Sequence, residues 1–154
     1  MIEPYETALR NASQDFPTLG FSLANNTEYA ATLSIGNYSI EISTDRYYHP
    51  GLSVTIRDPM GKHFEIGLVR QILDPVHYEQ DMAALKAIRE RFGLDQPDTP
   101  REARLKGIAE YVCVSFDQIL RFLAAHRERV FVTPNEYEAN YISRANARVS
   151  QILK

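Results

Sequence analysis

The chain has 154 residues, 44% of them hydrophobic, which is enough to bury a core and predicts one domain over residues 1–154. Its formal net charge of −3 argues against nucleic acid as a partner, because phosphate backbones attract basic surfaces. The single cysteine, Cys113, excludes an internal disulfide. The acidic start and the charges that interrupt every apolar segment predict a cytoplasmic protein with no signal peptide and no membrane span.

The first residues carry the pattern of an amphipathic helix. Apolar side chains recur at steps of three and four residues, and the stripe stops before Pro17 and Gly20. The stripe consists of Ile2, Tyr5, Leu9, Ala12 and Phe16. From Phe21 the period changes to two, which predicts a short strand and then a turn near Asn25 and Asn26.

A tight hairpin is predicted within residues 29–43. Gly36 and Asn37 separate two alternating runs, and a two-residue Gly-Asn loop places glycine where the backbone needs a positive φ. The resulting register pairs Ile35 with Tyr38, Leu33 with Ile40, and Ala31 with Ile42, all on one face.

A second hairpin is predicted between residues 52–58 and 62–70. The loop Pro59-Met60-Gly61 suits a type I turn followed by a bulge at the glycine. This register pairs Ile56 with Phe64, Val54 with Ile66, and Leu52 with Leu68.

Three helices are expected after the strands. One begins at Asp74-Pro75 and ends at Gly93. Another follows the capping box at Thr99, runs from residue 100 to about residue 126, and is apolar enough to be the central helix. The last follows a similar box at Thr133 and covers residues 134–153.

These elements predict an α+β fold. One helix precedes an antiparallel meander of four or five strands, and three helices follow, in the order αββββ(β)ααα. Because the apolar side chains of both hairpins share one face, the helices are expected to cover that face and to leave a face rich in serine and threonine open.

No motif in the sequence indicates a particular chemical reaction. The histidines are scattered and no metal-binding spacing occurs, so we expect no metal and no cofactor. Cys113 is expected to be an unreactive thiol in the core. Glu41 and Glu65 are predicted on the open face, where exposure to solvent favours a role in solubility over acid–base catalysis.

The stretch STDRYYHPG, residues 43–51, is predicted to join the two hairpins. It is interpreted either as a structural corner, turned by Pro50 and Gly51, or as a contact surface for another protein, because tyrosine and arginine are common at interface centres. The partner-binding residues predicted from the sequence are Glu41, Asp45, Arg46, Tyr47, Tyr48, His49 and Glu65.

The segment YSIEISTDRYYHPGLSVTI and its continuation to Pro75 resemble small bacterial α+β proteins of the immunity type, which accompany secreted or contact-delivered toxins. The resemblance implies a non-catalytic cytoplasmic protein that neutralises a cognate toxin by tight binding. An acidic open face would suit a basic toxin domain.

Two other hypotheses remain open. The chain could be a small enzyme or ligand-binding domain with a pocket near Asp45, Tyr48 and His49, in which Asp45 orients His49 as a general base. Tyr137 and Tyr141 could equally serve a homodimer, so self-association is a further expectation.

Overall fold

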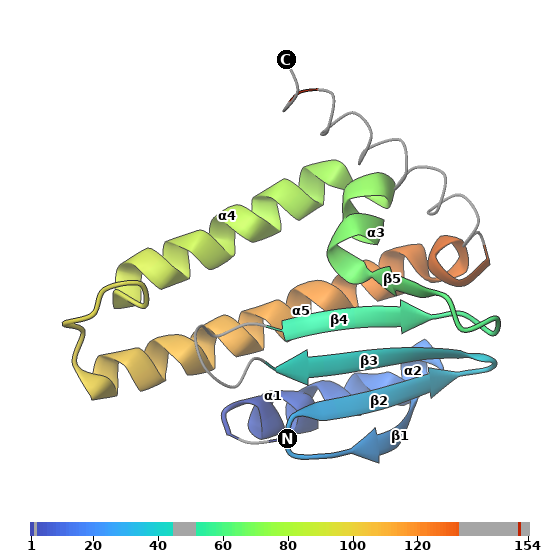
Figure 1. The fold of residues 1–154 in the computed structure, drawn as a ribbon, viewed down its shortest axis with the longest axis horizontal. Coiled ribbons are helices and arrows are strands. Elements are labelled where there is room, and N and C mark those ends of the chain that lie inside the picture. Colours follow the sequence, from blue (N-terminus) through green and yellow to red (C-terminus); the bar gives the residue numbers. More distant parts are fainter. Residues whose placement is uncertain (2, 45–51, 133–150, 152–154) are drawn as a thin grey trace.

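The computed structural model describes residues 1, 3–44, 52–132 and 151. Within these ranges the fold is α+β, with short N-terminal helices, a five-stranded antiparallel sheet and then further helices (Figure 1). The strands follow one another in chain order, β1-β2-β3-β4-β5, as predicted for a meander.

The N-terminal stripe forms more than one helix. Helix α1 covers Tyr5–Ala12, a 3₁₀ turn covers Ser13–Asp15, and α2 covers Phe16–Leu19. Pro17 lies in the first turn of α2, where its missing N–H leaves no hydrogen bond unmade, so the chain continues past the predicted stop. Gly20 then ends α2 with a φ of +82°.

Strand β1 covers Ser22–Asn26, so the turn predicted near Asn25 and Asn26 comes directly after these two residues. The register with β2 shifts between Leu23 and Asn25, and the chain turns after Asn26. The amide and the hydroxyl of Thr27 both donate to the carbonyl of Ala30 there.

The first hairpin is confirmed. Strands β2, Ala30–Ile35, and β3, Tyr38–Thr44, pair in the predicted register from Ile35–Tyr38 to Ala31–Ile42. Gly36 has a φ of +56°, as the two-residue loop requires.

The second hairpin is confirmed only near its turn. Strands β4, Leu52–Arg57, and β5, His63–Glu65, pair Ile56 with Phe64, and Gly61 has a φ of +84°. The predicted pairs Val54–Ile66 and Leu52–Leu68 do not form, because the chain becomes helix α3, Ile66–Leu73.

The spacing of buried residues explains this change. Ile66, Val69, Arg70 and Leu73 are buried at helical intervals. The carboxylate of Glu65 accepts hydrogen bonds at 3.1 Å from the amides of Gly67 and Leu68, which satisfies two of the free N–H groups at the start of the helix.

Two long helices complete the described fold. Helix α4 covers Pro75–Phe92 and ends at Gly93, as predicted. Helix α5 covers Arg101–Val132, beyond its predicted end, with a local break at His126, where φ is −123°. The buried ring of Phe131 packs against Tyr38 and Phe21, and this contact holds the extra turns against the sheet. Of the predicted last helix, residues 134–153, the structure describes residue 151 alone, and Tyr137 and Tyr141 lie outside the described residues.

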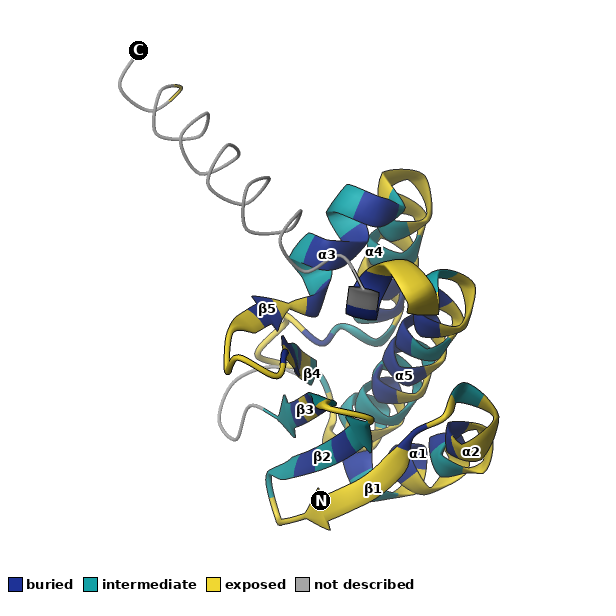
Figure 2. Ribbon diagram, turned by 90° about the vertical axis from the view of Figure 1, so that its right-hand side faces the viewer, coloured by how far each residue is buried: buried dark blue, intermediate teal, exposed yellow. Residues whose placement is uncertain are grey.

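The helices cover one face of the sheet (Figure 2). Leu33, Ile40, Val54 and Ile56 from the strands are at most 2% exposed and join α1, α3 and α5 in one buried cluster. Helix α4 packs on α3 and α5. The apolar face therefore lies against the helical layer, as the alternating pattern predicted.

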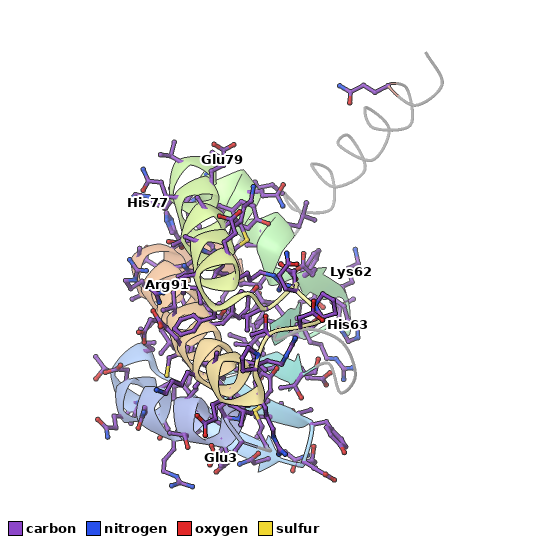
Figure 3. All side chains as sticks on the ribbon, turned by 90° about the vertical axis from the view of Figure 1, so that its left-hand side faces the viewer. Glu3, Lys62, His63, His77, Glu79 and Arg91 are labelled. Atoms are coloured by element: carbon purple, nitrogen blue, oxygen red, sulfur yellow. The ribbon has the colours of Figure 1, made fainter. Side chains whose placement is uncertain are left out.

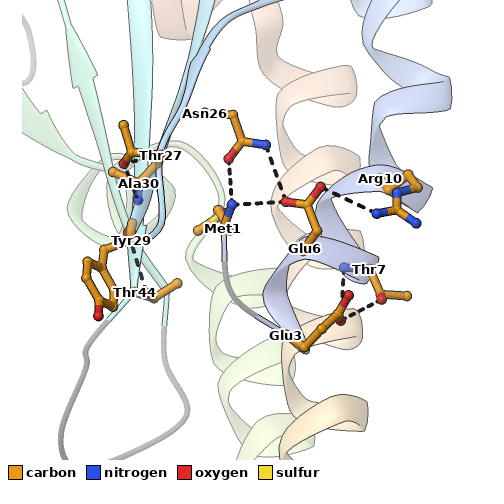
Figure 4. A network of polar contacts seen from close by, with 10 residues as sticks. All are labelled: Met1, Glu3, Glu6, Thr7, Arg10, Asn26, Thr27, Tyr29, Ala30 and Thr44. Atoms are coloured by element: carbon orange, nitrogen blue, oxygen red, sulfur yellow. Dashed lines mark hydrogen bonds and ion pairs between the residues drawn. The ribbon is translucent and has the colours of Figure 1, made fainter.

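Polar contacts also tie α1 to the edge strand (Figure 4). The amino group of Met1 donates to Asn26 Oδ1 at 2.7 Å and to Glu6 Oε2 at 3.0 Å. The hydrogen bond from this ammonium group, followed by that from Asn26, lowers the pKa of Glu6 below its ordinary value.

Candidate functional site

The open face of the sheet consists mainly of small polar side chains in register. Its rows follow from the strand pairing. One row contains Thr32, Glu41, Thr55 and Glu65, a second contains Ser34, Ser39, Arg57 and His63, and a third contains Ala30, Ser43 and Ser53. Because these side chains are mostly short, the face is flat for most of its width.

Glu41 lies at the centre of this face. It belongs to the middle strand, it is exposed, and its cross-strand neighbours are Thr32 and Thr55. Among the residues that the structure describes, its carboxylate has no hydrogen bond or ion pair. Glu41 can therefore accept a cationic or hydrogen-bonding group from another molecule without losing an internal partner.

Glu65 has a different role from Glu41. It is also exposed on this face, but its carboxylate caps α3. Thr55 separates the two residues in the row, so their strands are roughly 10 Å apart. That separation is too large for the two carboxylates to share a proton, and the face offers no coupled acid–base pair.

Two basic side chains of the face contact each other. Arg57 Nη2 lies 3.1 Å from His63 Nε2 on the neighbouring strand. Figure 3 shows His63 on the opposite side of the molecule from His77, so these two histidines cannot act together.

The predicted contact residues 45–49 lie outside the described residues, between the end of β3 at Thr44 and the start of β4 at Leu52. The alternative pocket near Asp45, Tyr48 and His49 lies there too. Both remain predictions.

A second polar site, which was not predicted, lies among the C-terminal helices. A cavity of about 200 Å³ opens between α3, α4 and α5. Its lining comprises Arg70, Asp74, His77, Tyr78, Asp81, Gln118, Arg121, Phe122 and Ala125. Charged groups of both signs meet aromatic rings here, in contrast to the flat sheet face.

Arg70 is the most buried charge in this cavity. Its side chain is 5% exposed and forms an ion pair with Asp81, and its guanidinium group lies 5.3 Å from the ring centre of Tyr78 and 5.8 Å from that of Phe122. Burial lowers the pKa of Arg70 below its ordinary value, and Asp81 opposes this effect. Asp81 and the two rings thus hold the group in one orientation.

Asp74 joins two histidines at the rim of the cavity. Its carboxylate lies 2.9 Å from His77 Nδ1 and 3.0 Å from His126 Nε2. These hydrogen bonds, from His77 first, lower the pKa of Asp74 below its ordinary value. Asp74 was predicted to cap α4, but its side chain makes no capping hydrogen bond and binds the histidines instead.

Sequence patterns alone gave separate roles to these residues. The four-residue spacing of His77 and Asp81 indicates a solvated pair, and the position of His126 near the end of the predicted helix indicates a cation that complements the helix dipole. The sequence contains one indication of a polar site. Once residues 66–73 are recognised as a helix, Arg70 lies on the buried, otherwise apolar face of that helix.

Other candidate groups are less suited to chemistry. Cys113 is exposed on α5, so the prediction that it belongs to the core is wrong. Partial desolvation by the neighbouring atoms, followed by the charge of Asp117, raises the pKa of its thiol above the ordinary value, which disfavours the reactive thiolate. In the described ranges, no group of three or more His, Cys, Asp and Glu side chains is placed to hold a metal ion.

Comparisons with protein-family models, with curated proteins and with solved structures found no match to this chain. None of the described helices has the length and apolar character needed to cross a bilayer.

Proposed function

We propose that this chain is a non-catalytic binding protein that uses the open face of its sheet, centred on Glu41, to bind another protein. The immunity-type resemblance makes a cognate bacterial toxin the proposed partner. The observation that carries the proposal is the exposed Glu41 carboxylate, which has no partner among the described residues and lies in the middle of a sheet face that no described helix covers.

The shape of the face supports a protein partner over a small molecule. Five strands at their usual spacing span roughly 20 Å, and strands of about six residues are also roughly 20 Å long, which gives about 400 Å². A small molecule would need a concave site to be enclosed. A flat surface of this size suits part of a protein interface instead.

The same estimate shows that the sheet face is too small to form a stable interface by itself. A stable interface buries about 800 Å² on each partner, so the sheet supplies about half of that area. Residues of the connection between Thr44 and Leu52, which mark the ends of β3 and β4, are proposed to supply the rest. They are Asp45, Arg46, Tyr47, Tyr48 and His49.

The charge at the centre of the face points to a basic partner. Glu65 caps α3, so among the described residues of the face Glu41 is the acidic group that is left for an intermolecular ion pair, while Arg57 and His63 contact each other in another row. A lysine or arginine of the toxin domain would complement it and increase the association rate at low ionic strength.

The test is co-purification with the product of the adjacent gene, followed by titration calorimetry. Glu41→Arg is expected to weaken binding at least about tenfold, because it places like charges opposite each other. Glu79→Arg makes the same change in charge on the exposed surface of α4 and should leave affinity unchanged. Equal affinities for the two variants, or no complex at all, would refute the proposal.

A further inference from the structure

The tip of the β4–β5 hairpin presents an apolar side chain to solvent. Met60 is 86% exposed, more than any other large apolar side chain in the described part of the chain. It occupies the loop Pro59-Met60-Gly61, which follows the end of β4 (Figure 1). A methionine so exposed adds almost nothing to the core, and burying it against another molecule would be favourable.

Asp58 holds this loop in one conformation. Its side chain is nearly buried, and its Oδ1 accepts hydrogen bonds from the amides of Met60 at 2.9 Å and Lys62 at 2.8 Å. The carbonyl of Asp58 also accepts from the amide of Gly61, and its amide donates to the carbonyl of Lys62, both at 3.0 Å. The backbone that carries Met60 is therefore fixed before a partner binds, which reduces the conformational entropy that binding costs.

Basic side chains lie beside Met60. Arg57, Lys62 and His63 are all exposed, and Figure 3 shows Lys62 and His63 on the same side of the molecule. The carboxylate of Asp58 faces the turn amides and is nearly covered, so the tip presents positive charge to solvent. Such a surface complements carboxylates on another molecule.

The tip lies close to the centre of the open sheet face. Glu41 pairs with Thr55, and Arg57 follows two residues further along β4, on the same face. At the usual strand spacing, Arg57 and Glu41 are therefore roughly 8 Å apart along the backbone surface. A protein that covers Glu41 is expected to reach the tip as well.

We propose that the β4–β5 tip inserts Met60 into an apolar pocket rimmed by carboxylates on the partner protein. This inference rests on the proposed function, because the same partner places a cation opposite Glu41. The partner surface is thus bipolar, with basic groups at its centre and acidic groups at the pocket. One methionine on a fixed turn fits a single protein pocket, whereas binding to a bilayer depends on a larger apolar area.

The first experiment measures binding of the full chain to the product of the adjacent gene by titration calorimetry. Met60→Ser should weaken binding about tenfold, because it removes the apolar group that the pocket encloses. It should leave thermal unfolding unchanged, since Met60 lies outside the core. Val76→Ser is the matched control, because Val76 is 63% exposed on α4, in the helical layer, and its substitution should preserve affinity.

The second experiment tests the acidic rim through the rate of association. Arg57→Gln should lower the association rate constant at low ionic strength at least about threefold, because it removes a charge that attracts the carboxylates. Arg101→Gln makes the same change at the exposed start of α5 and should leave the rate unchanged. An unchanged rate for Arg57→Gln would overturn the acidic rim.

The remaining outcomes separate this inference from the proposed function. A complex that Glu41→Arg weakens and Met60→Ser does not would overturn the inference alone. The reverse pattern would refute the role of Glu41 and support docking by the tip, and the absence of any complex would refute both. Vesicles that contain phosphatidylserine are expected not to bind the chain. Vesicle binding that Met60→Ser abolishes would assign the tip to a bilayer and overturn the inference.

Discussion

The Nε2 atom of His126 lies 3.0 Å from Oδ2 of Asp74, although 52 residues separate them in the chain. Asp74 lies between α3 and α4, and His126 lies at the break in α5. One carboxylate therefore connects the junction of two helices to the irregular turn of a third.

This contact predicts a dependence of stability on pH. The pKa of Asp74 is lowered in the folded chain, so above the ordinary value of 3.8 its carboxylate is charged in both states and the native contacts stabilise the fold. As pH falls below 3.8, the unfolded chain takes up the proton first, and the contribution disappears once pH passes the lowered native value.

Asp74→Asn is the variant that isolates this effect. Chemical unfolding across the acid range should give a difference in free energy of unfolding between wild type and variant that is largest near neutral pH and shrinks in acid. A difference that stays constant with pH would contradict the assigned role of the carboxylate.

Arg70 and Asp81 form a buried ion pair, and removing one of the two charges should strongly destabilise the fold. Arg70→Met leaves the carboxylate of Asp81 without its nearest cation and should reduce the free energy of unfolding by roughly 3 kcal/mol. The double variant Arg70→Met with Asp81→Leu should recover much of this loss, because it removes both charges from the interior. Urea unfolding of the single and double variants measures both values.

The chain offers a matched control for that experiment. Arg91 and Glu110 form an exposed ion pair between α4 and α5. Arg91→Met should change stability by less than about 1 kcal/mol, since solvent screens the pair. Similar losses for Arg70→Met and Arg91→Met would mean that burial does not strengthen the inner pair.

Gly107 allows a close approach between α4 and α5. A Cβ atom at this position would lie 2.5 Å from Cβ of Phe92 and 2.9 Å from Cδ2 of Leu94. Gly107→Ala should therefore destabilise the fold by about 1–2 kcal/mol, although alanine favours helices elsewhere. Thermal unfolding provides the measurement.

Gly67→Ala is the comparison. Its nearest contact would be Oε1 of Glu65 at 2.9 Å, the end of a side chain that can move, although its cap hydrogen bonds to Gly67 and Leu68 would lengthen. Gly67→Ala should therefore destabilise the fold less than Gly107→Ala does. The reverse order would argue against tight packing between the two helices.

Substitutions at Glu65 and Glu41 should distinguish a residue that stabilises the fold from one that serves binding. Glu65→Ala removes the cap of α3 and should reduce the free energy of unfolding by about 1 kcal/mol. Glu41→Ala should change it by less than about 0.5 kcal/mol, because this carboxylate is exposed. Denaturant titration gives both values, and a larger loss for Glu41 would place its role in folding rather than recognition.

Local patterns predicted much of the sheet and less of the site. The register of residues 30–43 followed from alternation and from the turn at Gly36, since both depend on neighbouring residues. The same alternation failed after Glu65, because an apolar run of this length fits a strand or a helix equally well. The cap formed by Glu65 and the packing of Val69 in the core stabilise the helix rather than a strand.

The sequence by itself determined the α+β order, the antiparallel meander and the two-faced character of its central hairpin, because these depend on backbone preferences and side-chain alternation over a few residues. Only the tertiary structure decided that Arg70, Asp81 and Gln118 share a cavity and that Asp74 meets His126. Those contacts depend on how three helices pack across long sequence separations, and no local period encodes that geometry.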